Sequence, residues 1–163
     1  MAKSIRQFRF LTALGVLCAT ACRHDPPPPA DTSAVPDPGA PPASGKAEYH
    51  EDTFDLAIRP IGALTSGTPG AVEIQLSAKG GYHCNDKYPY KFKTGQSEGI
   101  QFAAPVFTKD ALTLEEMKAT MKVDLTPQTK GEKSIRGMFA FSLCSAERCL
   151  VEKRELETKI AVN

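Results

Sequence analysis

Residues 47–163 of this 163-residue chain alternate apolar and polar side chains along several segments. In 71–77 the residues Val72, Ile74 and Leu76 fall on one face, and 121–125 repeats the pattern with charged residues between its apolar ones. Successive side chains of a strand point to opposite faces of a sheet, so this alternation is typical of strands with one buried face. The chain is therefore constrained to fold into antiparallel sheets that cover a shared core.

Other segments have the same strand character, and turn residues separate them. The additional strand segments are 54–58, 91–93, 100–102, 134–144 and 150–162. Glycine and proline mark turns at 66–70, 80–81, 94–95 and 130–131. Only 110–118 has a composition that suits a helix, and a turn or short helix suffices there. The pattern predicts an all-β fold for 47–163, an immunoglobulin-like antiparallel β-sandwich of about seven strands. We expect the charged residues of 152–157 on a solvated strand face.

The start of the chain has the pattern of an export signal. Lys3, Arg6 and Arg9 precede an apolar run at 10–21, and no acidic residue occurs before that run. A basic start followed by about a dozen apolar residues is typical of a secretory signal peptide, and a membrane span needs about 20. We therefore expect residues 1–21 to direct export, which places the remaining chain in an oxidising compartment.

The end of this segment carries a second signal. The residues Ala19-Thr20-Ala21-Cys22 resemble the bacterial lipoprotein signal, in which small residues precede a cysteine that is diacylated and becomes residue one. The resemblance implies lipidation of Cys22, for example with palmitate, and a membrane anchor in the envelope of a Gram-negative-type bacterium. Arg23 follows the cysteine, which favours the outer membrane over the inner, with the domain facing the periplasm or the surface. The alternative is an ordinary signal cleaved near Ala21.

Residues 22–46 differ in composition from everything that follows. Eight of the 13 prolines lie in this segment, which has no aromatic residue and no aliphatic residue larger than Val35. Such a composition buries too little apolar area to offset the entropy of ordering the chain. We predict a disordered, proline-rich linker that separates the domain from its anchor.

Charge and motif content exclude several function classes. The chain has 20 Lys and Arg against 19 Asp and Glu, so it lacks the basic excess of nucleic-acid-binding proteins. It contains no Gly-x-Ser-x-Gly motif and no phosphate-binding loop, and we predict no hydrolase activity and no cofactor. His83 and Cys84 are neighbours whose side chains point to opposite faces of a strand, which disfavours a zinc site that would use both.

Two cysteines near the end of the chain are the main candidates for chemistry. Four residues separate Cys144 from Cys149, and strand patterns lie on both sides. If those strands pair as a hairpin, the two cysteines face each other at its mouth within disulfide range. Closing so small a loop adds only about 2 kcal/mol in the chain-entropy model. The bond is therefore open to a redox and to a structural interpretation. Cys84 is either a buried small apolar residue or a third thiol that resolves a mixed disulfide.

Two motifs together resemble a known family. The run Gly80-Gly81-Tyr82-His83-Cys84-Asn85-Asp86-Lys87-Tyr88-Pro89, followed late in the chain by the pair Cys144 and Cys149, resembles the N-terminal periplasmic domain of the thiol:disulfide interchange protein DsbD. The resemblance covers about 55–163 and implies an immunoglobulin-like sandwich. It implies that Cys144 and Cys149 form a redox pair that receives electrons from a membrane partner and passes them to a periplasmic thioredoxin-like protein. Tyr82 and His83 would lie near this pair.

Three classes of function remain at this point. The first is a thiol:disulfide exchange module that uses Cys144 and Cys149. The second is a non-catalytic envelope lipoprotein that binds another protein or ligand, with the same pair as a structural disulfide. The third is a module that handles copper or another metal through thiols, which we rank last because the chain has only four Met and three His. Whether the protein is an enzyme stays open.

Overall fold

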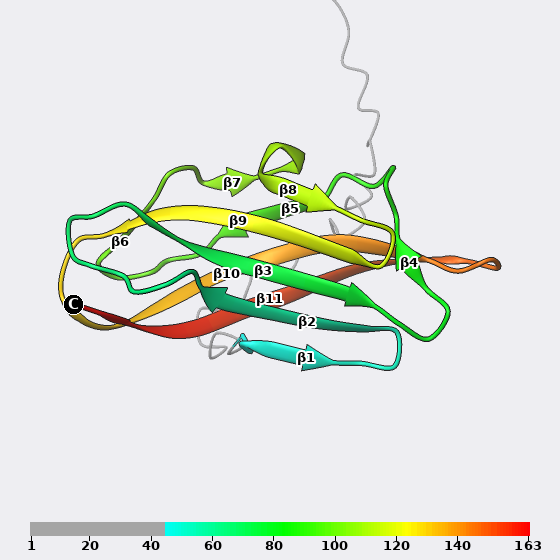
Figure 1. Cartoon of the computed structure of the whole chain (residues 1–163), viewed down its shortest axis with the longest axis horizontal. Helices are drawn as coiled ribbons and strands as arrows, with labels where there is room; N and C mark the ends of the chain where they lie inside the picture. Colours follow the sequence, from blue (N-terminus) through cyan, green and yellow to red (C-terminus); the bar gives the residue numbers. More distant parts are fainter. Residues whose placement is uncertain (1–44) are drawn as a thin grey trace, which may run out of the picture. The chain divides into compact units, whose positions relative to one another are not determined.

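The computed structural model describes residues 45–163 (Figure 1). The predicted signal peptide, the lipidation site Cys22 and almost all of the predicted linker lie outside these residues. The strands of this range are β1 (Glu48–His50), β2 (Phe54–Pro60), β3 (Gly70–Ala78), β4 (His83–Cys84), β5 (Lys91–Thr94), β6 (Ile100–Phe102), β7 (Val106–Phe107), β8 (Leu112–Leu114), β9 (Lys118–Pro127), β10 (Gly131–Cys144) and β11 (Cys149–Val162). No helix in the range is long and apolar enough to cross a membrane.

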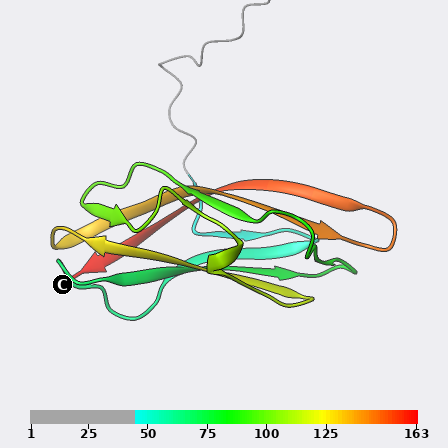
Figure 2. The same ribbon diagram turned by 90° about the horizontal axis from the view of Figure 1, so that it is seen from above.

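The strands form two antiparallel sheets that face each other. The first has the order β1-β2-β3-β9-β6, and β8 also pairs with β9. The second has the order β11-β10-β5-β7, and β4 also pairs with β10. Figure 2 shows the two layers, with the long β10–β11 hairpin in one and β2 and β3 in the other. The predicted all-β sandwich is confirmed. It has more strands than expected because β1, β4, β7 and β8 have only two or three residues, too few to show a period of two.

The core lies between the sheets, where the alternating residues predicted to be buried meet. Val72, Ile74 and Leu76 of β3 are fully buried. Val72 lies directly opposite Val123 of β9, and Ile74 lies directly opposite Met121. The second sheet contributes a row of aromatic residues. The ring of Phe141 lies 5.4 Å from that of Phe139 on the same strand and 5.0 Å from that of Phe54 in the opposite sheet. Aromatic packing thus joins the two layers.

In the segment 110–118, where a turn or short helix was expected, the structure has a short turn and then a strand. The structure has a single 3₁₀ turn at Lys109–Ala111, followed directly by β8. Leu112 and Leu114 pair with Met121 and Ala119 of β9, so this stretch extends the first sheet. The hydrogen bonds and packing that β9 offers exist only in the folded domain, and they decide between two conformations that the local sequence leaves open.

The β10–β11 hairpin is the dominant element of the second sheet. Its register runs without a bulge from Gly131 opposite Val162 to Cys144 opposite Cys149. Figure 1 shows that its closed end projects beyond the neighbouring strands, past β4. The hairpin therefore places the two candidate cysteines at one tip of the domain.

Candidate functional site

Backbone pairing at the hairpin tip brings Cys144 and Cys149 together. The Ser145 N–H donates to the Arg148 carbonyl (2.8 Å), so Ser145 and Arg148 form a hydrogen-bonded pair. Hydrogen-bonded and non-hydrogen-bonded pairs alternate along an antiparallel ladder, so the next pair, Cys144 and Cys149, is a non-hydrogen-bonded pair. Opposed residues come closest at such positions of an antiparallel ladder. The two Cα atoms are 4.0 Å apart and the sulfurs are bonded. The tip is also held by Ser145 Oγ, which accepts from the N–H groups of Glu147 (3.2 Å) and Arg148 (3.3 Å).

The two halves of the disulfide differ in accessibility. Cys144 is 8% exposed, whereas Cys149, directly opposite it on the edge strand β11, is exposed. A thiol reagent that approaches from solvent therefore meets Cys149 first. Disulfides persist in oxidising compartments, so this bond is consistent with a location outside the cytoplasm.

Tyr82 and His83 lie next to the disulfide. His83 is directly opposite Cys144 in the β4–β10 ladder and is exposed, so its side chain lies on the same face of the sheet as the disulfide. Tyr82 is 8% exposed, and its hydroxyl accepts a hydrogen bond from Arg148 Nε (2.9 Å). An open pocket of about 390 Å³ lies between the turn at 80–82 and the tip residues 145–148.

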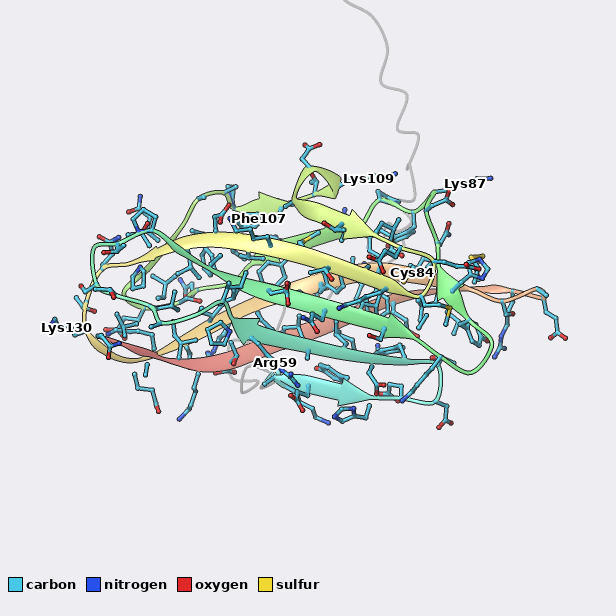
Figure 3. The ribbon with its side chains drawn as sticks, in the orientation of Figure 1. Arg59, Cys84, Lys87, Phe107, Lys109 and Lys130 are labelled. Atoms are coloured by element: carbon cyan, nitrogen blue, oxygen red, sulfur yellow. A yellow bond between two sulfur atoms is a disulfide. The ribbon has the colours of Figure 1, made fainter. Side chains whose placement is uncertain are left out.

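Cys84 lies on the other face of the same strand pair. It is directly opposite Leu143, is 4% exposed and has no disulfide partner among residues 45–163. Burial raises the pKa of its thiol, an effect that a hydrogen bond with Tyr90 partly offsets. Figure 3 labels Cys84 at the β4 end of the sandwich. The core-facing position separates this thiol from the disulfide, and a resolving role would require β4 to leave β10.

The predicted solvated face at 152–157 is wrong for two residues. Glu152 and Arg154 lie four and two residues before the buried Leu156 in the same strand, so their side chains are on its inward face, at the open edge of the sandwich. Their side chains form an ion pair (2.6 Å), and the Arg154 guanidinium lies 5.5 Å from the centre of the Phe54 ring. The even spacing of Glu152 and Arg154 from Leu156 and Ile160 was the sequence signal that could have predicted their inward position.

His50 belongs to an exposed ion-pair network on the first sheet. Its Nδ1 contacts Asp55 (2.9 Å) and its Nε2 contacts Glu48 (3.5 Å). The hydrogen bond with Asp55 raises the pKa of His50, and Lys79 beside Asp55 lowers the pKa of that carboxyl. Among residues 45–163, no group of three or more His, Cys, Asp or Glu side chains has an arrangement that could hold a metal ion.

Comparisons with known proteins assign no family to this chain. No protein-family model and no curated protein sequence matches this chain. A similar solved structure is AggA, the major subunit of aggregative adherence fimbriae type I from Escherichia coli, with a TM-score of 0.32 and 12% identity over 71% of this chain and 100% of that chain. Another is a cohesin module of a Clostridium perfringens family 33 glycoside hydrolase, with a TM-score of 0.36 and 12% identity over 69% of this chain and 98% of that chain.

A third similar structure is a PapD-like domain of human CEP192, with a TM-score of 0.28 and 12% identity over 83% of this chain and 99% of that chain. These similarities assign neither a family nor a function to this chain. The resemblance to the DsbD family therefore rests on the motifs at 80–89 and 144–149 alone.

Proposed function

We propose that this protein is a lipid-anchored binding module of the bacterial cell envelope, in which the Cys144–Cys149 disulfide holds the projecting end of the β10–β11 hairpin. The observation that carries the proposal is the position of the bond at the closed tip of that hairpin, beyond the neighbouring strands. A cross-link there restrains the turn at 145–148, whose residues are not part of the buried core cluster. Such a restraint preorganises a contact surface and lowers the entropy cost of binding a partner.

Two independent features support the proposed location. The disulfide indicates an oxidising, extracytoplasmic compartment. The residues Ala19-Thr20-Ala21-Cys22 support diacylation of Cys22 and anchoring, with the outer membrane favoured over the inner. The proline-rich composition of 22–46 supports a spacer between that anchor and the β-sandwich.

Thiol:disulfide exchange with a periplasmic thioredoxin-like protein is the second candidate. The exposure of Cys149, with His83 beside Cys144, favours it. A partner thiolate would attack the Cys149 sulfur to form a mixed disulfide, and Cys144 would leave as a thiolate that takes a proton from water. A second thiol of the partner would then attack the mixed disulfide and release Cys149. The two electrons come from this reducing partner, which becomes the disulfide, and the reversed steps would pass them from the Cys144 and Cys149 thiols to a thioredoxin-like protein.

The reduction potential of the Cys144–Cys149 bond separates the two candidates. Structural disulfides have potentials below about −300 mV, and exchange-active ones lie markedly higher. We expect a value below that limit in equilibrium with a dithiol buffer, measured on a Cys84→Ala background so that no other thiol of the domain takes part. A higher potential, together with a partner trapped on Cys149 in a Cys144→Ala variant, would establish exchange in its place.

A further inference from the structure

The outer edge of β11 has two parts, of which one is already paired. The Lys46 N–H donates to the Glu155 carbonyl (3.3 Å), and the Glu157 N–H donates to the Lys46 carbonyl (3.1 Å). Residues two apart in a strand direct their backbone groups to the same edge. Because the β10–β11 register has no bulge, Cys149, Val151 and Lys153 direct their N–H and carbonyl groups to this edge as well.

The part of this edge at 149–153, which we call the tip edge, has no strand partner among residues 45–163. Among residues 45–163, no backbone hydrogen bond outside the β10–β11 ladder involves Val151, and the Lys153 carbonyl accepts only from Arg154 Nη1 (3.1 Å). Val151 is 62% exposed, more than any other large hydrophobic residue of the described chain. An open strand edge with an exposed apolar residue is a template for another strand.

The charges around the tip edge indicate the chemistry of its partner. Lys153 lies opposite Ala140 of β10, and Ala140 in turn lies opposite Lys91 of β5, so both lysines point to the outer face of the second sheet. Neither lysine forms a salt bridge among the described residues. Two lysines without acidic partners, beside exposed Val151, favour a strand that carries an acidic residue and an apolar one.

We propose that the tip edge binds an extended segment of a partner protein by antiparallel strand addition, with an apolar residue opposite Val151 and an acidic residue opposite Lys153. Backbone hydrogen bonds supply affinity, and the alternating side chains supply selectivity. This inference rests on the proposed function as a binding module and names the kind of partner. The disulfide contributes by holding Cys149 in place, so the edge is ordered before the partner arrives.

A second copy of the chain fits the tip edge poorly. Symmetric antiparallel pairing about Val151 would place Lys153 opposite Cys149 of the other copy, so neither lysine would meet an acidic residue, and pairing about Glu152 would place two glutamates opposite each other. Symmetric pairing about Lys153 would place two lysines opposite each other. Like charges at directly opposed positions destabilise a strand pair, so the charge pattern of the edge selects a different chain.

The test uses a defined peptide probe and the oxidised protein. The probe is an acetylated and amidated peptide of sequence Thr-Thr-Glu-Thr-Val-Thr-Thr, compared with a version that has lysine in place of glutamate. A third version is N-methylated at its valine, which removes the central backbone donor. Binding is followed by two-dimensional NMR of ¹⁵N-labelled mature chain that carries Cys22→Ser for solubility. We expect amide shifts confined to the tip edge and its flanks, affinity about fivefold higher for the acidic than for the lysine peptide, and no binding of the N-methylated version.

Two variants make the test specific. Val151→Pro removes an edge donor that β10 does not use, so the hairpin ladder stays intact while peptide binding is lost, and Val151→Thr is the matched control that retains binding. Lys153→Glu keeps the backbone and should invert the preference toward the lysine peptide. This second variant keeps the proposal falsifiable if Val151→Pro does not fold.

Several outcomes would overturn the proposal. These are peptide shifts outside the tip edge, equal affinity for both peptides, or no shift at millimolar peptide. Slow exchange of the Val151 amide in the free monomer would show that an upstream segment of the same chain occupies the edge, and concentration-dependent dimerisation would show a second copy there. The two proposals can fail separately. A high reduction potential together with a trapped thiol partner would contradict the proposed function, yet it would not change peptide binding to the tip edge of the oxidised protein.

Discussion

Cys84 and Cys149 show how position in a strand decides what a thiol can do. Cys84 faces the core opposite Leu143, whereas Cys149 lies on the exposed side of the hairpin tip. A thiolate is the reactive form of cysteine, and burial raises the pKa of Cys84 and so disfavours that form. We therefore assign Cys84 a packing role, and any exchange chemistry belongs to the Cys144–Cys149 pair.

This difference predicts which thiols react in the folded protein. With the disulfide intact, Cys84 should resist an Ellman-type reagent from pH 7 to pH 9 and react only after unfolding in guanidinium chloride. In Cys144→Ala the released Cys149 should react at once under native conditions, which provides the matched control. Rapid native labelling of Cys84 in the oxidised protein would show that β4 opens readily and would restore its role as a third thiol.

Strand β10 illustrates how a glycine permits the packing of a whole element. Gly137 lies opposite Thr94 of β5, and a Cβ added there would overlap the Phe92 ring and lie 2.6 Å from the Lys93 carbonyl oxygen. The Phe92 side chain is fully buried and fills the space that a larger residue would need. The contact between β5 and β10 therefore depends on the absence of a side chain at this position.

Gly137→Ala should lower the free energy of unfolding by about 1–3 kcal/mol, because overpacking forces Phe92 or β5 to move. The measurement is urea unfolding followed by circular dichroism. Met138→Ala, at the adjacent and 39% exposed position, is the control and should change stability by less than about 0.5 kcal/mol. Equal effects of the two substitutions would contradict the close packing of Phe92 on the glycine.

At the scale of the whole molecule, one core serves both sheets. The buried cluster contains residues from β2 and β3 of the first sheet and from β5, β10 and β11 of the second, and Phe54 contacts Phe141 across the interface. Neither sheet can bury its inner face without the other. The domain should therefore unfold as one cooperative unit.

Tyrosine fluorescence can test whether unfolding is cooperative, since the chain has four Tyr and no Trp whose emission would dominate the signal. Tyr82 and Tyr90 are both buried, so their fluorescence reports on the packing near β4 and β5. Unfolding followed by tyrosine fluorescence and by far-ultraviolet circular dichroism should give the same midpoint. Two distinct midpoints would show that the end of the sandwich near the disulfide opens before the rest.

The sequence predicted the long strands well because each carries several residues of one parity. Val72, Ile74 and Leu76 mark β3 as buried on one face, and Leu156, Ile160 and Val162 do so for β11. The strands β1, β4, β7 and β8 could not be predicted in the same way, since two or three residues contain no period. The inward position of Glu152 and Arg154 was missed because their charge suggested solvent while their parity indicated the core edge.

By itself, the sequence determined the all-β class, the two-sheet sandwich and the pairing of Cys144 with Cys149 across a hairpin, because side-chain alternation and hairpin spacing are local properties of the chain. Only the tertiary structure decided which face of β4 carries His83 and which carries Cys84, and that Tyr82 contacts Arg148. It also decided that, within residues 45–163, Lys46 pairs with the edge of β11 whereas Val151 has no backbone partner on that edge. These features depend on which distant strands lie side by side. That arrangement is set by the burial of a core shared between the sheets, and no local pattern encodes it.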